Sequence, residues 1–125
     1  MENGVVEAIA AGRFIFGLAF LISAVLNFGL VGMHTELAKR YNIPFPRVCV
    51  IATVVFLVLL SAMITFEIWV TPAAIGIGAA LAIITPLYHD FWKFTGPERS
   101  RKLHHLLENV AVFGALIVLA AVYWN

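Results

Sequence analysis

Residues 48–66 read VCVIATVVFLVLLSAMITF, a run of 19 residues without a charged side chain or a histidine. After Glu67, a second such run of 21 residues covers residues 68–88. A helix needs about 20 apolar residues to cross the roughly 30 Å of hydrocarbon in a bilayer, because each residue adds about 1.5 Å. One helix through both runs would be about twice too long. The chain is therefore predicted to reverse near Glu67, with Pro72 in the first turn of the second helix.

Two further runs, residues 14–33 and residues 109–125, also lack charged residues and histidine. Backbone amide and carbonyl groups find no water in the hydrocarbon core, so each run is predicted to be helical. The predicted fold class is all-α, an integral membrane four-helix up-down bundle that forms a single domain over residues 1–125. Its membrane spans are expected at about residues 8–31, 47–66, 70–88 and 106–124.

The composition agrees with a membrane protein and excludes several other classes. Hydrophobic residues make up 62% of the 125 residues and charged residues 12%, whereas soluble domains have about 45–50% and about 25%. A disordered chain would show the opposite balance. The net charge of +1 provides no basic excess for nucleic acid, which is not expected as a partner. The single cysteine, Cys49, excludes an internal disulfide and a multi-cysteine metal cage.

The positive charges predict the orientation of the chain. With four crossings, the loops at 34–47 and 89–108 share one side of the membrane, opposite both termini and the turn near Glu67. The side with these two loops holds seven of the eight basic residues: Lys39, Arg40, Lys93, Arg99, Arg101, Lys102 and Arg47. Arg13 alone lies toward the other side. Short loops rich in Lys and Arg stay in the cytoplasm, so both termini are predicted to lie outside the cell (inner) membrane.

Small residues indicate which helices pack most closely. In lipid, helices associate through close backbone approach and polar contacts. The third span contains the pairs Gly76-xxx-Ala80 and Gly78-xxx-Ala82, so it is expected to be the most enclosed helix. Gly12, Gly17 and Ala24 are expected to serve the first span in the same way.

Polar residues inside the spans are few. Asn27 lies about one turn after Ser23 in the first span, and a hydrogen bond to a neighbouring helix is the favoured interpretation over contact with a ligand. None of the four runs has a carboxylate near its middle. This pattern argues against a proton relay and makes a small-solute carrier the weakest functional hypothesis.

A denser polar cluster lies on the predicted cytoplasmic side, comprising His34, His89, Asp90, His104, His105, Glu108 and Asn109. His104 and Glu108 share a helix face at i,i+4, but the paired Glu-x-x-His motifs of di-iron bundles are missing. No metal site is expected, and interfacial hydrogen bonds or contacts with head groups or a partner are favoured. The histidines lie at span ends, which disfavours haem. A quinone head group needs only an apolar slot with one or two donors, such as His89, Asn109 or Asn27.

Three segments resemble the DoxX family. Residues 12–20, GRFIFGLAF, resemble its opening, in which an Arg precedes a first helix containing Gly and Phe. Residues 89–92, HDFW, resemble its His-x-Phe-Trp signature after the third helix, and residues 109–116, NVAVFGAL, its Asn-anchored fourth helix. The second helix lacks the acidic residue and glycine pair that the family often carries there. The resemblance implies a small four-helix protein of the cell membrane, associated with quinone-linked redox systems such as terminal quinol oxidase and thiosulfate:quinone oxidoreductase.

Together these observations favour a small membrane subunit of, or accessory to, a quinone-linked respiratory complex. Its expected partners are membrane lipid and other membrane protein subunits, and a homo-oligomer is left open. The favoured interpretation is that the chain has no catalytic activity of its own, and no catalytic residue is assigned. The candidate cofactor-binding positions, which need not form one site, are His89, Asn109, Asn27 and Arg13, with quinone as the one cofactor considered. The alternative is a stand-alone assembly or interaction factor that recognises membrane proteins through Trp92 and the loop at 93–104.

Overall fold

The computed structural model describes residues 2–88 and 90–125, and all regular structure in these residues is helical. Four of the helices described are long and apolar enough to cross a membrane. The elements are α1 (Asn3–Leu26), η1 (Asn27–Leu30), α2 (Val31–Arg40), α3 (Pro46–Thr65), α4 (Val70–Tyr88), η2 (Phe91–Lys93) and α5 (Gly96–Val122), where η marks a 3-10 turn. The predicted all-helical class is confirmed.

The chain reverses between α3 and α4 within the four residues 66–69. Glu67 and Trp69 both adopt left-handed backbone conformations there, with φ of 58° and 45°, which lets so short a segment turn. Pro72 lies in the first turn of α4, where its missing N–H leaves no hydrogen bond unmade. The predicted reversal near Glu67 is confirmed.

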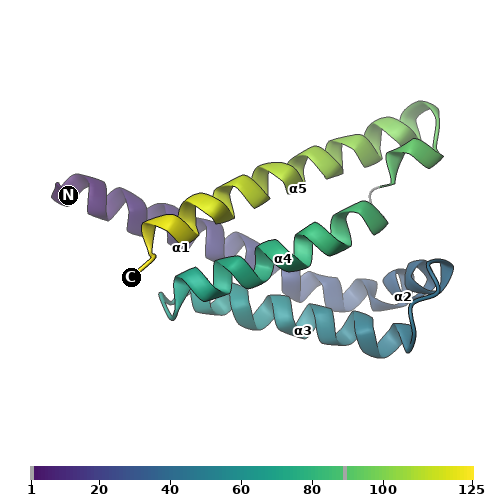
Figure 1. Ribbon diagram of the computed structural model, residues 1–125, viewed down its shortest axis with the longest axis horizontal. Coiled ribbons are helices and arrows are strands. Elements are labelled where there is room, and N and C mark those ends of the chain that lie inside the picture. The colour runs from purple at the N-terminus through teal and green to yellow at the C-terminus, as the bar shows by residue number, and fades with distance from the viewer. Residues whose placement is uncertain (1, 89) are drawn as a thin grey trace.

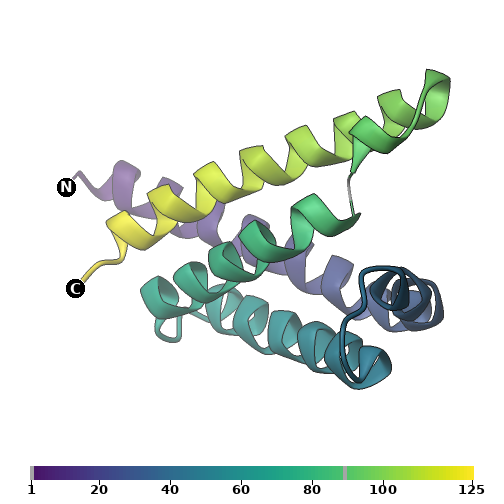
Figure 2. The same ribbon diagram turned by 45° about the vertical axis from the view of Figure 1, so that its right-hand side comes forward.

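The helices form two closely packed pairs. Helix α1 packs along α3 and helix α5 along α4, while α3 and α4 also touch. Figures 1 and 2 show the two pairs close together near the α3–α4 turn and diverging toward α2. The two termini lie at the end of the molecule opposite α2 (Figure 1). The molecule therefore has a narrow end at the α3–α4 turn and a wide end at α2.

Two regions differ from their expected loops. The region 34–47 contains most of α2, which buries Val31, Thr35 and Ala38 against α3. Helix α5 begins at Gly96, not near 106, because Pro97 occupies the first turn, where proline is tolerated. Both segments carry charged residues. A search for runs without charged residues therefore finds the apolar spans but not these helical turns.

The core is built around α4, as expected for the third span. The apolar window of α4 is 44% buried, against 33% for α3, 17% for α1 and 11% for α5. Ala73, Ala74 and Ile77 of α4 are almost completely buried. Large apolar side chains such as Ile15 and Ile83 instead lie on the outside. A chain of this size thus exposes far more apolar surface than soluble monomers do.

Helices α1 and α3 approach each other closely at Gly17. A Cβ atom at Gly17 would lie 2.7 Å from the backbone nitrogen and 2.7 Å from the hydroxyl of Thr65. Ala24 is also buried in this region. Gly12, by contrast, has nothing within 4 Å of a Cβ placed on it, so the expected close packing at Gly12 does not occur. It lies elsewhere around the circumference of α1.

Candidate functional site

A cleft of about 460 Å³ lies between the two helix pairs toward the wide end of the molecule. Residues from α1, η1, α2, α3, α4 and α5 line it, namely Phe20, Ser23, Ala24, Asn27, Leu30, His34, Val50, Thr53, Val54, Leu57, Leu81, Ile84, His105 and Asn109. Its volume falls within the range of about 300–1,000 Å³ that is typical of small-molecule sites. All four long helices contribute, so the cleft exists only in the folded chain.

The cleft is polar on some walls and apolar on others. Hydroxyl, carboxamide and imidazole side chains come from Ser23, Asn27, His34, Thr53, His105 and Asn109, whereas Phe20, Leu57 and Leu81 supply apolar surface. Among the residues that the structure describes, no Lys, Arg, Asp or Glu lines the cleft. It can therefore orient an uncharged polar group by hydrogen bonds, but it offers no fixed charge to a phosphate or an ammonium group.

Asn27 and Asn109, two of the sequence-predicted site residues, both line this cleft. Asn109 on α5 donates a hydrogen bond to the hydroxyl of Thr85 on α4, 3.4 Å away. The side chain of Asn27 has no hydrogen-bond partner within residues 2–88 and 90–125. The expected bond from Asn27 to a neighbouring helix is therefore absent among these residues.

Two histidines line the cleft together with Asn27 and Asn109. His34 on α2 and His105 on α5 come from opposite helix pairs. The sequence analysis placed both in a general interfacial cluster and not among the site residues. A signal was present in the sequence, because His105 precedes Asn109 by four residues and so shares its helix face.

Arg13 lies at the narrow end of the molecule, away from the cleft lining. Its guanidinium donates hydrogen bonds to the carbonyl oxygens of Ile64 at 2.8 Å and Thr65 at 2.6 Å, and Nε donates to the hydroxyl of Tyr123 at 3.1 Å. The carbonyls at a helix C-terminus lack partners within the helix and carry partial negative charge. Arg13 therefore ties α1 to the end of α3 and to α5.

Gly17 and Arg13 act on the same contact, because they lie four residues apart on one face of α1. Gly17 lets the backbones approach at Thr65, and one turn away Arg13 reaches the last carbonyls of α3. The remaining predicted site residue, His89, lies outside the described residues. The structure thus brings Asn27 and Asn109 together and places Arg13 elsewhere.

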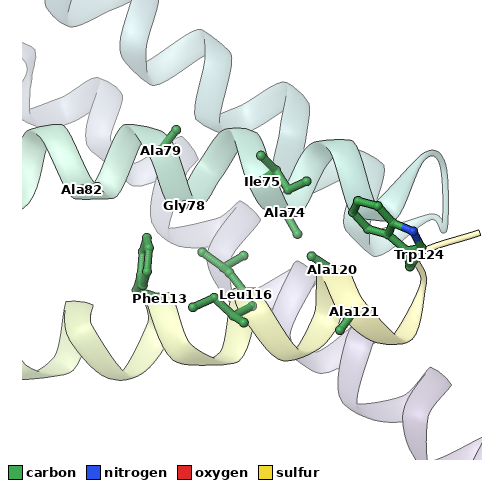
Figure 3. A pocket seen from close by; sticks show the side chains of 11 residues that line it. Ala74, Ile75, Gly78, Ala79, Ala82, Phe113, Leu116, Ala120, Ala121 and Trp124 are labelled. Carbon is green, nitrogen blue, oxygen red and sulfur yellow. The ribbon is translucent and has the colours of Figure 1, made fainter.

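A second hollow of about 470 Å³ lies between α4 and α5. Figure 3 shows Phe113 and Leu116 of α5 directed toward α4, opposite Ala74 and Gly78, with Trp124 at one end. Its walls are apolar, so nothing in them fixes the orientation of a ligand. The cleft with Asn27 and Asn109 is the better candidate for a functional site.

No protein-family model, curated protein or solved structure matches the chain. The DoxX resemblance therefore depends on its motifs alone. Within the described residues, the first motif supplies the α1–α3 contact through Arg13 and Gly17. The motif that begins at Asn109 contributes that one residue to the lining of the cleft.

Proposed function

We propose that the four long helices cross a cell membrane as an up-down bundle, with both termini outside and α2 and the α4–α5 connection in the cytoplasm. The length and apolar character of the helices and the large apolar side chains on their outer faces support insertion. The orientation is supported by the basic residues, because seven of the eight belong to α2, η2 and the first turns of α3 and α5.

The orientation predicts the behaviour of fusion proteins. Alkaline phosphatase fused after Asn125 should be active, because this enzyme folds only outside the cytoplasm, whereas green fluorescent protein fused there should be dark. Fusions within the connection at 94–95 should behave in the opposite way. Recovery of the chain in the soluble fraction, or the same signal from both fusion sites, would contradict the proposed topology.

Within this membrane protein, the cleft is proposed to hold the head of a quinone, and the chain to act as a subunit of, or accessory to, a quinone-linked redox complex. The observation that carries this proposal is that Asn27 and Asn109 line one cleft, to which the described residues contribute no Lys, Arg, Asp or Glu. A quinone ring is flat and uncharged and has two carbonyl acceptors, which carboxamide and imidazole N–H groups satisfy. A phospholipid phosphate would require a basic side chain in the cleft.

The residues present fit such a head group. Asn27, Asn109, His34 and His105 would hold its carbonyl oxygens, while Phe20 and other apolar side chains would cover the ring. A bound quinone supplies reversible two-electron, two-proton chemistry. The chain itself binds and orients the ring and limits its contact with water. The electron donor or acceptor is expected in a partner subunit, which agrees with the resemblance to subunits of quinone-linked enzymes.

Replacement of the carboxamides should remove the quinone. The protein is purified from membranes in a mild detergent, and the bound lipid-soluble molecules and co-purifying proteins are identified by mass spectrometry. In the double variant Asn27→Leu/Asn109→Leu, the amount of bound quinone should fall about tenfold or more below that of the wild type, because each lost neutral hydrogen bond costs about 1 kcal/mol of binding free energy.

Asn3→Leu is the matched control for this experiment. It makes the same chemical change in the first turn of α1, outside the cleft lining, and should leave the quinone content unchanged. Purification of the wild-type chain alone, with neither quinone nor a redox partner, would contradict the proposed function. Equal quinone in the double variant and the wild type would contradict the assignment of the site.

A further inference from the structure

Asp90 is the centre of a polar contact at the wide end of the molecule. It lies just before η2, and its side chain is 11% exposed. Oδ2 accepts a hydrogen bond from the hydroxyl of Tyr41. Lys93 Nζ lies 3.6 Å from Oδ2, and Lys102 Nζ lies 3.6 Å from Oδ1. We call these four residues, Asp90, Tyr41, Lys93 and Lys102, the Asp90 clasp.

The clasp joins the two helix pairs where they diverge. Tyr41 directly follows α2, which packs on α3, whereas Asp90 and Lys93 follow α4 and Lys102 belongs to α5. Lys93 Nζ also donates to the Tyr41 hydroxyl at 3.2 Å and lies 4.6 Å from the centre of its ring. At the narrow end the pairs are connected covalently by the α3–α4 turn, and the hydrogen bonds of Arg13 link α1 and α3 to Tyr123 after α5. At the wide end, the Asp90 clasp bridges them through non-covalent polar contacts.

Two residues of the clasp lie close in sequence to the histidines of the cleft. Lys102 precedes His105 by three residues on α5, and Tyr41 follows His34 by seven residues at the end of α2. A separation of α2 from the α4–α5 connection would therefore move His34 away from His105. It would also widen the cleft between the pairs.

We propose that the Asp90 clasp acts as a gate by setting the width of the cleft: it holds the two helix pairs together at the wide end in this structure, and the cleft widens when the Tyr41–Asp90 contact is broken. This inference rests on the proposed function, because it assigns the regulation of the same site. A largely buried carboxylate that has lost its partners is unstable, so Asp90 keeps this position only while Tyr41 and the two lysines contact it. A partner protein that competes for Asp90, or for either lysine, would open the cleft.

The gate is tested by measuring how fast a water-soluble thiol reagent reacts inside the cleft, an experiment that needs no quinone. Cys49, the single cysteine, is first replaced by serine. Val54→Cys then places a thiol of similar size on α3, at a position that lines the cleft and is 4% exposed. The reaction of this thiol with a small cationic methanethiosulfonate reports the open fraction when opening and closing are faster than labelling.

Tyr41→Phe and Asp90→Asn should each raise the labelling rate about tenfold or more, because Tyr41→Phe removes a hydrogen bond to a charged group and Asp90→Asn removes the charge that attracts Lys93 and Lys102. Glu98→Gln is the matched control. It removes a carboxylate from the exposed pair with Arg101, 2.6 Å apart within the first turns of α5, which does not bridge the two helix pairs. This control should label at the wild-type rate.

A second reporter separates opening of the cleft from general unfolding. Ser61→Cys places the thiol in a fully buried part of α3 outside the cleft lining, and it should stay unreactive in every clasp variant. Equal Val54→Cys rates with and without the clasp, or equal acceleration at both reporters, would overturn the gate. Faster labelling at Val54→Cys alone would support the gate even if no quinone were found, so the two proposals fail separately.

Discussion

Gly17→Leu is expected to separate α1 from α3 and to prevent recovery of a monodisperse protein, and Gly17→Ala is expected to lower the free energy of unfolding by about 1–3 kcal/mol. The added Cβ would lie 2.7 Å from the backbone nitrogen of Thr65. A backbone atom in a helix cannot move aside as the end of a side chain can. The measurements are the size-exclusion profile and the thermal midpoint by circular dichroism in detergent.

Gly12→Ala and Gly12→Leu are the matched controls, because they make the same changes five residues away on the same helix, where a Cβ meets open space. Their profiles should equal that of the wild type, and their midpoints should equal or slightly exceed the wild-type midpoint, because Ala and Leu favour a helix more than Gly does. Gly76→Ala should cost less than Gly17→Ala, since its Cβ would approach the mobile end of the Leu60 side chain at 2.7 Å. Equal midpoints for Gly17→Ala and Gly12→Ala would show that the α1–α3 contact is looser than described.

Arg13→Ala is expected to lower the free energy of unfolding by about 2–4 kcal/mol, because it removes three hydrogen bonds from a charged group. Arg13→Lys should recover only part of this loss, because an ammonium group lacks the fork with which a guanidinium spans several acceptors. Tyr123→Phe removes one of the three bonds and should cost about 1 kcal/mol. Thermal unfolding in detergent measures all three variants.

The same variants decide whether Arg13 also serves a ligand. Since Arg13 does not line the cleft, the quinone content per folded molecule of Arg13→Lys should equal that of the wild type. If Arg13→Ala unfolded at the wild-type midpoint but lost its quinone, the structural role described for Arg13 would be wrong. A binding role, as the sequence analysis considered, would then take its place.

The sequence was sufficient for the long helices because their signal is local. A run without charges, such as residues 48–66, shows both the position and the approximate length of its helix, whatever lies beside it. The helical turns at 31–40 and 96–105 carry polar residues, so the same criterion misses them. Their helical state follows from the packing of α2 on α3 and from Pro97, which lies in the first turn of α5, where proline is favoured.

The candidate site was only partly accessible from the sequence. Asn27 and Asn109 could be selected because carboxamides are costly in hydrocarbon unless they bond. Tyr41 could not be selected, since nothing nearby in the sequence indicates that its hydroxyl meets Asp90. The role of Arg13 was equally hidden, because its acceptors are backbone carbonyls of another helix, which every residue possesses.

The number and apolar character of the long helices were thus determined by the sequence alone, because hydrophobicity adds up along a contiguous segment. Only the tertiary structure decided that Asn27, His34, His105 and Asn109 share one cleft and that Asp90 bridges the two helix pairs. Such convergence depends on the axial position and rotation of each helix against the others. Those are set by contacts between distant residues, such as Gly17 with Thr65 and Arg13 with the end of α3.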